Sequence, residues 1–407
     1  MIDENADYKE NSDNSLKKKK KRWLAPLLIV IAVFVFVGGF FAWKTGFTFS
    51  KISTKGSGGF FDSLAHAIPG VKDTLKGEEE DRINIALLGM RGENDSSGGT
   101  LADTIIVASI EPKANRIALV SVPRDLWVKN PGTQSYSKIN AVHAYGEEDG
   151  KGQGLSQMEK VLEEVLGSQI HYAVKIDFKG FVDLVDAIGG VEITLDKPFE
   201  EGVQFNKPHV CDSYFTVPTG EYENKTVTYF SESSRTYKKR IVASYPLCTA
   251  PSSTLECGGN FKLPAGTQTL NAKQTLCFVR SRETSSDFER AKRQQIIIKE
   301  IQKKVTSIGT LSDFSKVNAI LDALGNNVKT DMQAWEMKRL YDLYKTMQSP
   351  QIAQRVLENS QEGLLYVPAE TPERGYTLQP IGDNYDRIHE MFKNIFTLPE
   401  QSDIKPK

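Results

Sequence analysis

The chain has 407 residues, of which 39% are hydrophobic and 25% charged, and its formal net charge is −1. These values are typical of a globular protein and exclude a wholly disordered, collagenous or polytopic membrane protein. The near-zero charge argues against nucleic acid as a partner, and four cysteines are too few for a disulfide-dense mini-protein. The length predicts two or three domains, or one large domain with attachments.

The N-terminal segment predicts a membrane anchor. Residues 1–22 are polar, end in the cations Lys17–Arg22 and predict a disordered cytoplasmic tail. Residues 23–43 carry no charge, span ~30 Å as a helix and have tryptophan at both ends, as a transmembrane helix does. The alternative is a cleaved signal peptide, but this apolar run is long for one and a poor cleavage site follows. We therefore expect a single-pass cell-membrane protein whose C-terminal part is extracytoplasmic.

Residues 44–80 predict a linker, and residues 81–400 predict one extracytoplasmic domain. Its first part contains three short runs rich in isoleucine and valine, typical of buried strands, at residues 83–88, 104–110 and 116–122.

Helices and strands then alternate. The capping-box pattern Ser156–Glu159 predicts the start of a helix that ends at Gly167. Residues 171–177 predict a strand, 178–188 a helix and 191–195 another strand. This alternation predicts an α/β fold, which we expect to be a three-layer α-β-α sandwich with a mixed central sheet.

Residues 200–262 interrupt this order with a segment rich in serine, threonine, tyrosine and proline, which predicts an insertion. Residues 268–282 predict a helix and a strand, 287–306 a long helix and 363–367 a short strand. Cys277 lies in an apolar run, Leu276–Val279, and is expected to be a buried free thiol. Two of the remaining cysteines could pair within the insertion, and the sequence leaves open which two: Cys211, Cys248 and Cys257.

Arginines with acidic neighbours stand where predicted strands end. Arg124 and Asp125 follow one strand. Arg280 and Arg282 end another, and the alternation of side chains along a strand points both to one face.

The first turns of the long predicted helix carry a similar group. At ~100° per residue, Asp287, Arg290 and Gln294 share one face, whereas Arg293 lies ~100° from Gln294. Arginine forks beside a helix N-terminus suit a phosphate group. The alternative for these residues is a solvent-exposed salt-bridge network.

Several of these segments together resemble the LytR-CpsA-Psr family. They occur in the family's order over residues 82–305, namely Ala102–Val107, Ser121–Asp125, Lys138–Ala141, Phe178–Val191 and Arg280–Gln295. The resemblance implies an enzyme that binds a polyprenyl-diphosphate-linked glycan and transfers the glycan phosphate to peptidoglycan, with Mg²⁺ as cofactor.

The resemblance also implies roles for individual residues. The catalytic group would be Arg124, Arg280, Arg282, Asp287 and Arg290. Substrate binding would involve Arg91, Asp125, Lys138, Asn140, Arg293 and Gln294. Asp103 would hold the metal, because Mg²⁺ prefers carboxylate and phosphate oxygens.

Two departures leave alternatives open. Where the family has an aspartate after the first strand, this chain has Met90-Arg91-Gly92, so either Glu93 or Asp95 supplies the second metal carboxylate or the metal site is weaker. An added acid, Glu289, stands near the predicted anion site. The alternatives to a transferase are a non-catalytic envelope sensor or transcriptional attenuator, and a polyprenyl-diphosphate pyrophosphatase.

Overall fold

The computed structural model describes residues 74–92, 99–150, 152–201, 209–210, 217–249, 261–281, 285–307, 320, 324–347, 349–359, 364–371, 374–399 and 401. The predicted tail, the predicted membrane helix and almost all of the predicted linker lie outside these residues. Among the helices that the structure describes, none has the length and hydropathy needed to cross a membrane.

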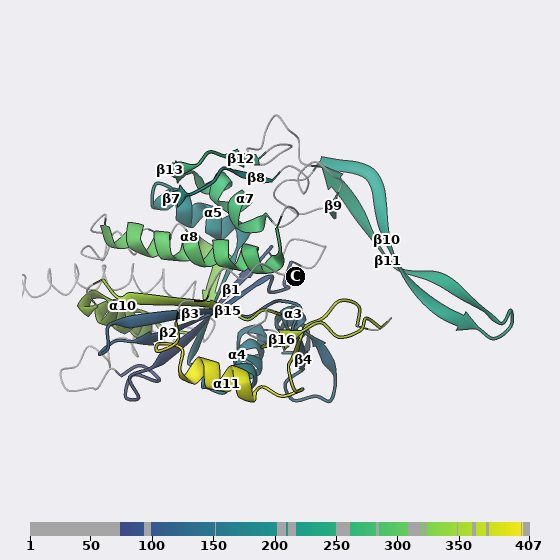
Figure 1. The fold of residues 1–407 in the computed structure, drawn as a ribbon, viewed down its shortest axis with the longest axis horizontal. Coiled ribbons are helices and arrows are strands. Elements are labelled where there is room, and N and C mark those ends of the chain that lie inside the picture. The colour runs from purple at the N-terminus through teal and green to yellow at the C-terminus, as the bar shows by residue number, and fades with distance from the viewer. Residues whose placement is uncertain are drawn as a thin grey trace, which may run out of the picture.

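A six-stranded mixed sheet forms the centre of the molecule (Figure 1). Its order is β14 (Val328–Thr330), β6 (Tyr172–Asp177), β1 (Ile83–Met90), β2 (Thr104–Glu111), β3 (Arg116–Ser121) and β15 (Gln351–Val356). The pairs β1–β6 and β3–β15 are parallel, whereas β2 is antiparallel to both of its neighbours. The expected mixed α/β fold is therefore confirmed.

Helices cover both faces of this sheet because its apolar residues alternate. Ala86 and Leu88 of β1 face one way, into a core shared with α3 (Ile139–Gly150), α4 (Gly154–Leu166) and α11 (Asp386–Lys393). Residues between them, such as Leu87, face the other way, toward α8 (Asp287–Ser307) and α10 (Ala334–Thr346). A period of two along each strand produces this division.

A second apolar core lies beside the sheet. It joins α5 (Phe178–Ala187) and α7 (Ala272–Arg280) to two short antiparallel pairs, β7 (Val191–Leu195) with β13 (Gly266–Leu270) and β8 (Phe199–Glu201) with β12 (Phe261–Leu263). The small pairs β4 (Trp127–Lys129) with β5 (Tyr136–Lys138) and β16 (Leu365–Tyr366) with β17 (Gln379–Pro380) complete the body of the molecule.

The insertion contains a long two-stranded hairpin, which we call the arm. Its strands are β10 (Val217–Ser231) and β11 (Thr236–Thr249), and β9 (His209–Val210) pairs with the base of β11. Figure 1 shows the arm projecting far from the rest of the molecule.

Two predictions of local structure are wrong. Leu276–Arg280 is the second half of helix α7 and not a strand, so alternation along a strand does not orient Arg280. The apolar run suggested a strand because buried helices and buried strands look alike over a few residues. The helix of residues 154–166 is preceded by Gln153, so Ser156 lies in its first turn and does not cap it.

The expectation for Cys277 is also wrong. Cys277 and Cys248 are both disulfide-bonded, although Cys277 is fully buried. The other three cysteines of the chain all lie between residues 211 and 257, so the bond of Cys277 joins helix α7 to the insertion. Cys211 and Cys257 themselves lie outside the described residues.

Candidate functional site

The order of the central sheet gathers charged residues at one edge. Met90 pairs with Asp177, Gly89 with Thr104, and Ser121 with Ile106. The ends of β1, β6 and β3 therefore meet the beginning of β2 at this edge. Asp103 directly precedes β2, and Arg124 follows β3, so an acid and a base that are 21 positions apart in sequence become neighbours.

A pocket opens at this edge, between the sheet and the first turns of α8. Its lining comprises Asp103, Thr104, Ile105, Ser121, Val122, Pro123, Arg124, Asp125, Asp287, Phe288, Arg290, Ala291, Gln294, Val356, Tyr376 and Leu378. Two arginines and three aspartates thus face one cavity that also has an apolar wall.

Alternating charges form a chain along the sheet side of the pocket. Arg124 donates to Asp103 Oδ1 at 2.9 Å, and Arg91 approaches Asp103 Oδ2 at 3.4 Å. Asp125 binds Arg124 at 3.4 Å through one oxygen and Lys138 Nζ at 2.6 Å through the other. The carboxylates compensate the close cations, so several positive groups can stand together without a bound anion.

Arg124 is the centre of this group. Burial alone would lower its pKa, but Asp103, Asp125 and Asp287 outweigh the burial and raise the pKa of Arg124 above its ordinary value. Its guanidinium therefore stays charged and is held from two sides by carboxylates.

Backbone hydrogen bonds of Asn140 fix the two segments of the sheet edge. Its N–H donates to the carbonyl of Arg124 at 3.2 Å, and its own carbonyl accepts from the N–H of Ala102 at 3.0 Å. Asn140 thus joins the segment carrying Arg124 to the residue before Asp103 through its main chain.

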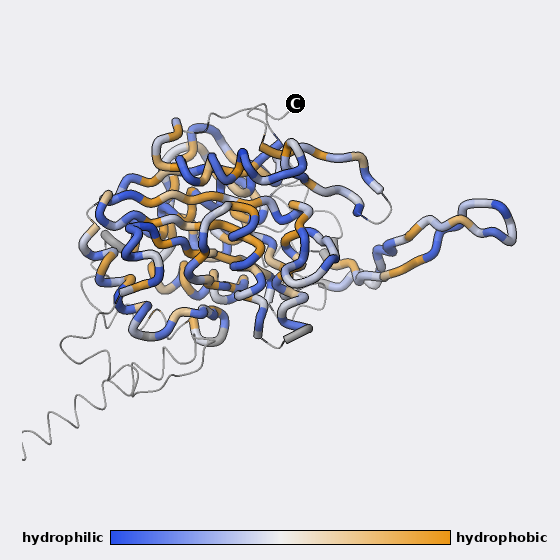
Figure 2. Tube along the Cα trace, turned by 90° about the horizontal axis from the view of Figure 1, so that it is seen from below, coloured by the Kyte–Doolittle hydropathy of each residue, from blue (hydrophilic) through white to orange (hydrophobic). Residues whose placement is uncertain are grey.

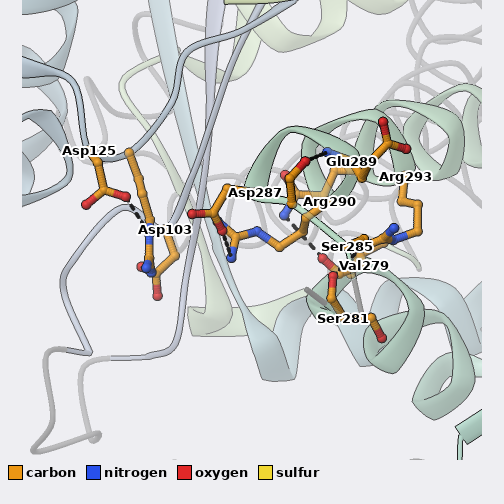
Figure 3. Close-up of polar contacts among 12 residues, drawn as sticks. Asp103, Asp125, Val279, Ser281, Ser285, Asp287, Glu289, Arg290 and Arg293 are labelled. Atoms are coloured by element: carbon orange, nitrogen blue, oxygen red, sulfur yellow. Dashed lines mark hydrogen bonds and ion pairs between the residues drawn. The ribbon is translucent and has the colours of Figure 1, made fainter. Parts of the chain in front are cut away.

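Helix α8 brings the second arginine to the pocket. Arg290 pairs with Asp287 at 2.8 Å one turn earlier on the same helix, and only 11% of its side chain is exposed. Figure 3 shows this pair opposite the group around Asp103 and Asp125. The hydroxyl of Ser286 accepts from the N–H of Glu289 and caps the start of α8, whose first turn lines the pocket with Asp287 and Phe288.

Arg293 occupies a different environment from the one predicted. Its guanidinium donates to the carbonyls of Phe278 and Ser281 and to the hydroxyl of Ser285. Figure 3 shows the Arg293 side chain turned toward Ser281 and Ser285. Burial lowers its pKa to about 10. The structure places Arg293 outside the pocket, where it joins the end of α7 to the start of α8.

The other predicted residues of α7 and α8 lie close to the pocket. Gln294 lines it and donates to the carbonyl of Val279 at 3.3 Å. Arg280 is the next residue after Val279, and its guanidinium lies 4.8 Å from the centre of the Phe178 ring and not in the pocket lining. Arg282, Glu93 and Asp95 lie outside the described residues.

Tyr376 is a pocket residue that sequence reasoning missed. Backbone hydrogen bonds of Leu378 with Asp125 and Trp127, 3.0 and 2.8 Å long, hold the segment of Tyr376 against the sheet edge. Burial, together with Asp125 and Asp287, raises the pKa of the Tyr376 hydroxyl. Nothing near Tyr376 in sequence marks it, because the acids that act on it, Asp125 and Asp287, lie on distant segments of the chain.

The donors at the site fit a cation that arrives with phosphate groups. Among the described residues, no group of three acidic, histidine or cysteine side chains could enclose a metal ion. Asp103 nevertheless lines the pocket with a partly exposed carboxylate. Mg²⁺ commonly binds one or two carboxylates and completes its shell with substrate phosphates and water, and Asp103 suits that arrangement.

Comparisons with known proteins agree with this architecture. The chain is 27% identical over 337 residues to a polyisoprenyl-teichoic acid–peptidoglycan teichoic acid transferase TagU of Oceanobacillus iheyensis, covering 82% of this chain and 84% of that relative. It is 22% identical over 387 residues to the corresponding transferase TagT of Bacillus subtilis, covering 94% of each. A solved structure of TagT bound to LI-WTA superimposes with a TM-score of 0.50 at 20% identity, covering 81% of this chain and 95% of that chain.

The family itself follows from the extent of the match. The model of the LytR_cpsA_psr family matches residues 61–375, which include the sheet edge and all of the pocket lining except Tyr376 and Leu378. The chain therefore belongs to the LytR-CpsA-Psr family.

Proposed function

We propose that this protein transfers a phosphate-linked glycan polymer from a polyprenyl-diphosphate carrier to peptidoglycan. The observation that carries the proposal is the convergence of Arg124 and Arg290, from a strand end and a helix N-terminus, on one pocket with an apolar wall. The names of the related transferases describe the same kind of donor and acceptor.

The reaction requires no nucleophile from the protein. A hydroxyl of the acceptor attacks the phosphorus that carries the glycan and loses its proton to solvent. The bond to the bridging oxygen breaks, and polyprenyl phosphate leaves with that oxygen. Negative charge grows on the leaving phosphate, and arginines fixed in advance stabilise it. Arg124 is fixed in this way by Asp103 and Asp125, and Arg290 by Asp287.

Bound diphosphate would add to existing ion pairs. Arg124 and Arg290 each have a carboxylate partner. A guanidinium has five N–H donors, so each arginine can bind a diphosphate oxygen while it keeps the carboxylate that fixes it. Lys138 is paired with Asp125, so it would help to hold that carboxylate in place beside Arg124.

We further propose that Mg²⁺ takes part, with Asp103 as its protein ligand. The ion would neutralise charge on the phosphate oxygens of the donor. The predicted anchor at residues 23–43 would hold the domain at the extracytoplasmic face of the membrane, where a lipid-linked donor is reached without leaving the bilayer.

The test uses the purified full chain in detergent, a polyprenyl-diphosphate oligosaccharide and peptidoglycan fragments, with Mg²⁺ or with chelator. Mass spectrometry should show glycan phosphate on the fragments and an equal amount of polyprenyl phosphate. Glycan phosphate released to water would identify a pyrophosphatase instead, and an unchanged donor would identify a sensor.

A pair of aspartate variants tests the metal ligand. Asp103→Asn should weaken the apparent affinity for Mg²⁺ by about tenfold, because a neutral amide replaces one charged ligand. The matched control is Asp342→Asn, which changes an exposed aspartate of α10 far from the pocket. Equal Mg²⁺ dependence in both variants would show that Asp103 is not a ligand.

A further inference from the structure

The outer part of the arm combines features of a binding surface that the pocket does not explain. The chain as a whole is nearly neutral, yet residues 225–241 contain one acid, Glu232, and five cations, namely Lys225, Arg235, Lys238, Lys239 and Arg240. The same segment exposes large apolar side chains, with 76% of Tyr237 and 51% of Phe230 accessible to solvent. In the part of the chain that the structure describes, no helix packs on this hairpin, so these residues add to no core there and their exposure calls for another cause.

Strand register assigns these residues to the two faces of the arm. Directly paired residues share a face, so Phe230 and Tyr237 lie together. Their rings meet edge to face, with 5.3 Å between the ring centroids. Lys239 follows Tyr237 two positions along β11 and is therefore on the same face, ~7 Å away.

The opposite face repeats the pattern. Tyr229 is paired with Lys238, and Arg240 follows two positions later. Each face thus presents an aromatic ring followed by a cation, and Figure 2 shows apolar and polar residues mixed along the arm. Cations spread over such a length suit an extended polyanion better than a compact one.

We propose that the outer arm binds the anionic polymer portion of the lipid-linked donor, while the pocket holds the diphosphate. This inference rests on the proposed function for the chemistry of the ligand, a chain of sugar or polyol units joined by phosphates. On one face, Lys238 and Arg240 would pair with successive phosphates, and on the other face Lys239 would pair with a phosphate. The exposed aromatic rings would pack on the apolar faces of the neighbouring units.

The tip of the arm favours a polymer over a membrane surface. A hairpin that enters a bilayer does so with its turn, but the turn here is Glu232-Ser233-Ser234-Arg235, which is polar throughout. Charged residues are costly to bring into the hydrocarbon region. The binding groups are placed on the sides of the arm, where a polymer can lie along it.

The base of the arm is fixed to the structure that carries the pocket. Cys248, near the end of β11, is disulfide-bonded, and the disulfide of Cys277 joins the insertion to α7, three residues before Arg280. The arm is therefore covalently tied to the structure that bears the site, and a polymer bound along it stays near the bound diphosphate.

The test measures binding of a purified teichoic acid that carries neither lipid nor diphosphate to the full chain in detergent, with dextran as the neutral probe. The triple variant Lys238→Gln, Lys239→Gln, Arg240→Gln should bind teichoic acid about tenfold more weakly and with a flatter dependence on salt. The matched control removes three exposed lysines of the body, Lys262→Gln, Lys303→Gln and Lys338→Gln, and should bind within about twofold of the original chain.

A second variant guards against a misfolded arm. Tyr237→Ser removes a side chain that is mostly exposed, and it should weaken teichoic acid binding about threefold without changing the melting temperature. Equal affinity in the original chain and both arm variants would overturn the proposal. So would a result in which the triple variant loses only its binding to vesicles of phosphatidylcholine with phosphatidylglycerol.

A transfer assay with a donor bearing one short oligosaccharide separates this proposal from the proposed function. The triple variant should transfer that short glycan at the original rate, because the pocket is intact. Absence of transfer by the original chain would contradict the proposed function alone, since polymer binding is measured without any transfer.

Discussion

The pocket and the arm both present cations, but they hold them in opposite ways. In the pocket, each described arginine is partly buried and lies against a carboxylate whose position the sheet or α8 fixes. In the outer arm, the cations are exposed and outnumber the acids by five to one. The difference teaches that arginines already paired with carboxylates suit one compact anion in one geometry. Exposed cations on a hairpin suit a long ligand that can bind in several positions along it.

The largest expected effect concerns the centre of the pocket. Arg124→Ala should reduce transfer by about a thousandfold, because it removes a preorganised fork and leaves Asp103 and Asp125 to repel the phosphate. Arg124→Lys, which keeps the charge and loses the fork, should retain more activity. The rate of transfer of a short glycan by each variant measures this effect. If Arg124→Ala transferred a short glycan as fast as the arm variants do, the pocket and the arm could not be assigned different roles.

A second prediction separates two neighbours on α8. Arg293→Ala should lower the free energy of unfolding by about 3 kcal/mol, because two buried carbonyls and one partly buried hydroxyl lose their donor. Arg290→Ala should instead abolish binding of the lipid diphosphate with a much smaller loss of stability. Urea denaturation and a donor-binding assay on both variants provide the comparison. Reversed outcomes would place Arg293 in the site and make Arg290 structural.

The third prediction concerns the link between the regions. Cys277→Ser should lower the free energy of unfolding by about 2–4 kcal/mol, as is typical when one disulfide is lost. Teichoic acid binding by the arm should persist, whereas the advantage of a long-polymer donor over a short one in transfer should fall. An unchanged ratio of long-donor to short-donor rates would show that the link does not couple the regions.

The smallest expected effect concerns His171, which lies outside both the pocket and the arm and should change stability without changing transfer or polymer binding. Burial lowers the pKa of His171, whose Nδ1 accepts a hydrogen bond from the N–H of Asn84 at 2.9 Å. The folded chain therefore binds fewer protons here than the unfolded chain, so stability should fall as the pH drops below about 6.5. His171→Gln should show a shallower loss of unfolding free energy in acid. If the unfolding free energy of His171→Gln and of the original chain fell equally with pH, groups other than His171 would determine the loss of stability in acid.

The sequence was sufficient to predict the sheet where strands are buried. Residues 83–88, 104–110 and 116–122 lie in the middle of the sheet and form almost continuous apolar runs. The arm was predicted only as an irregular insertion, because strands exposed on both faces carry no apolar alternation.

The site was predictable only where its residues cluster in sequence. Arg124 with Asp125, and Asp287 with Arg290, form local patterns that converge on one pocket. Arg280 was assigned to a strand because the short apolar run before it, Leu276–Val279, looks the same in a buried helix and in a buried strand. Tyr376 reaches the pocket through backbone pairing of a distant segment, a contact that no local pattern encodes.

Asn140 has a consequence for how substitutions at the site should be interpreted. Its N–H and carbonyl are the groups that join the segments of Arg124 and Ala102, and almost every amino acid supplies both. A complete substitution series at this position should therefore tolerate side chains of many kinds and reject proline, which has no N–H to donate. Importance at such a position belongs to the main chain, so an alanine scan would pass over it.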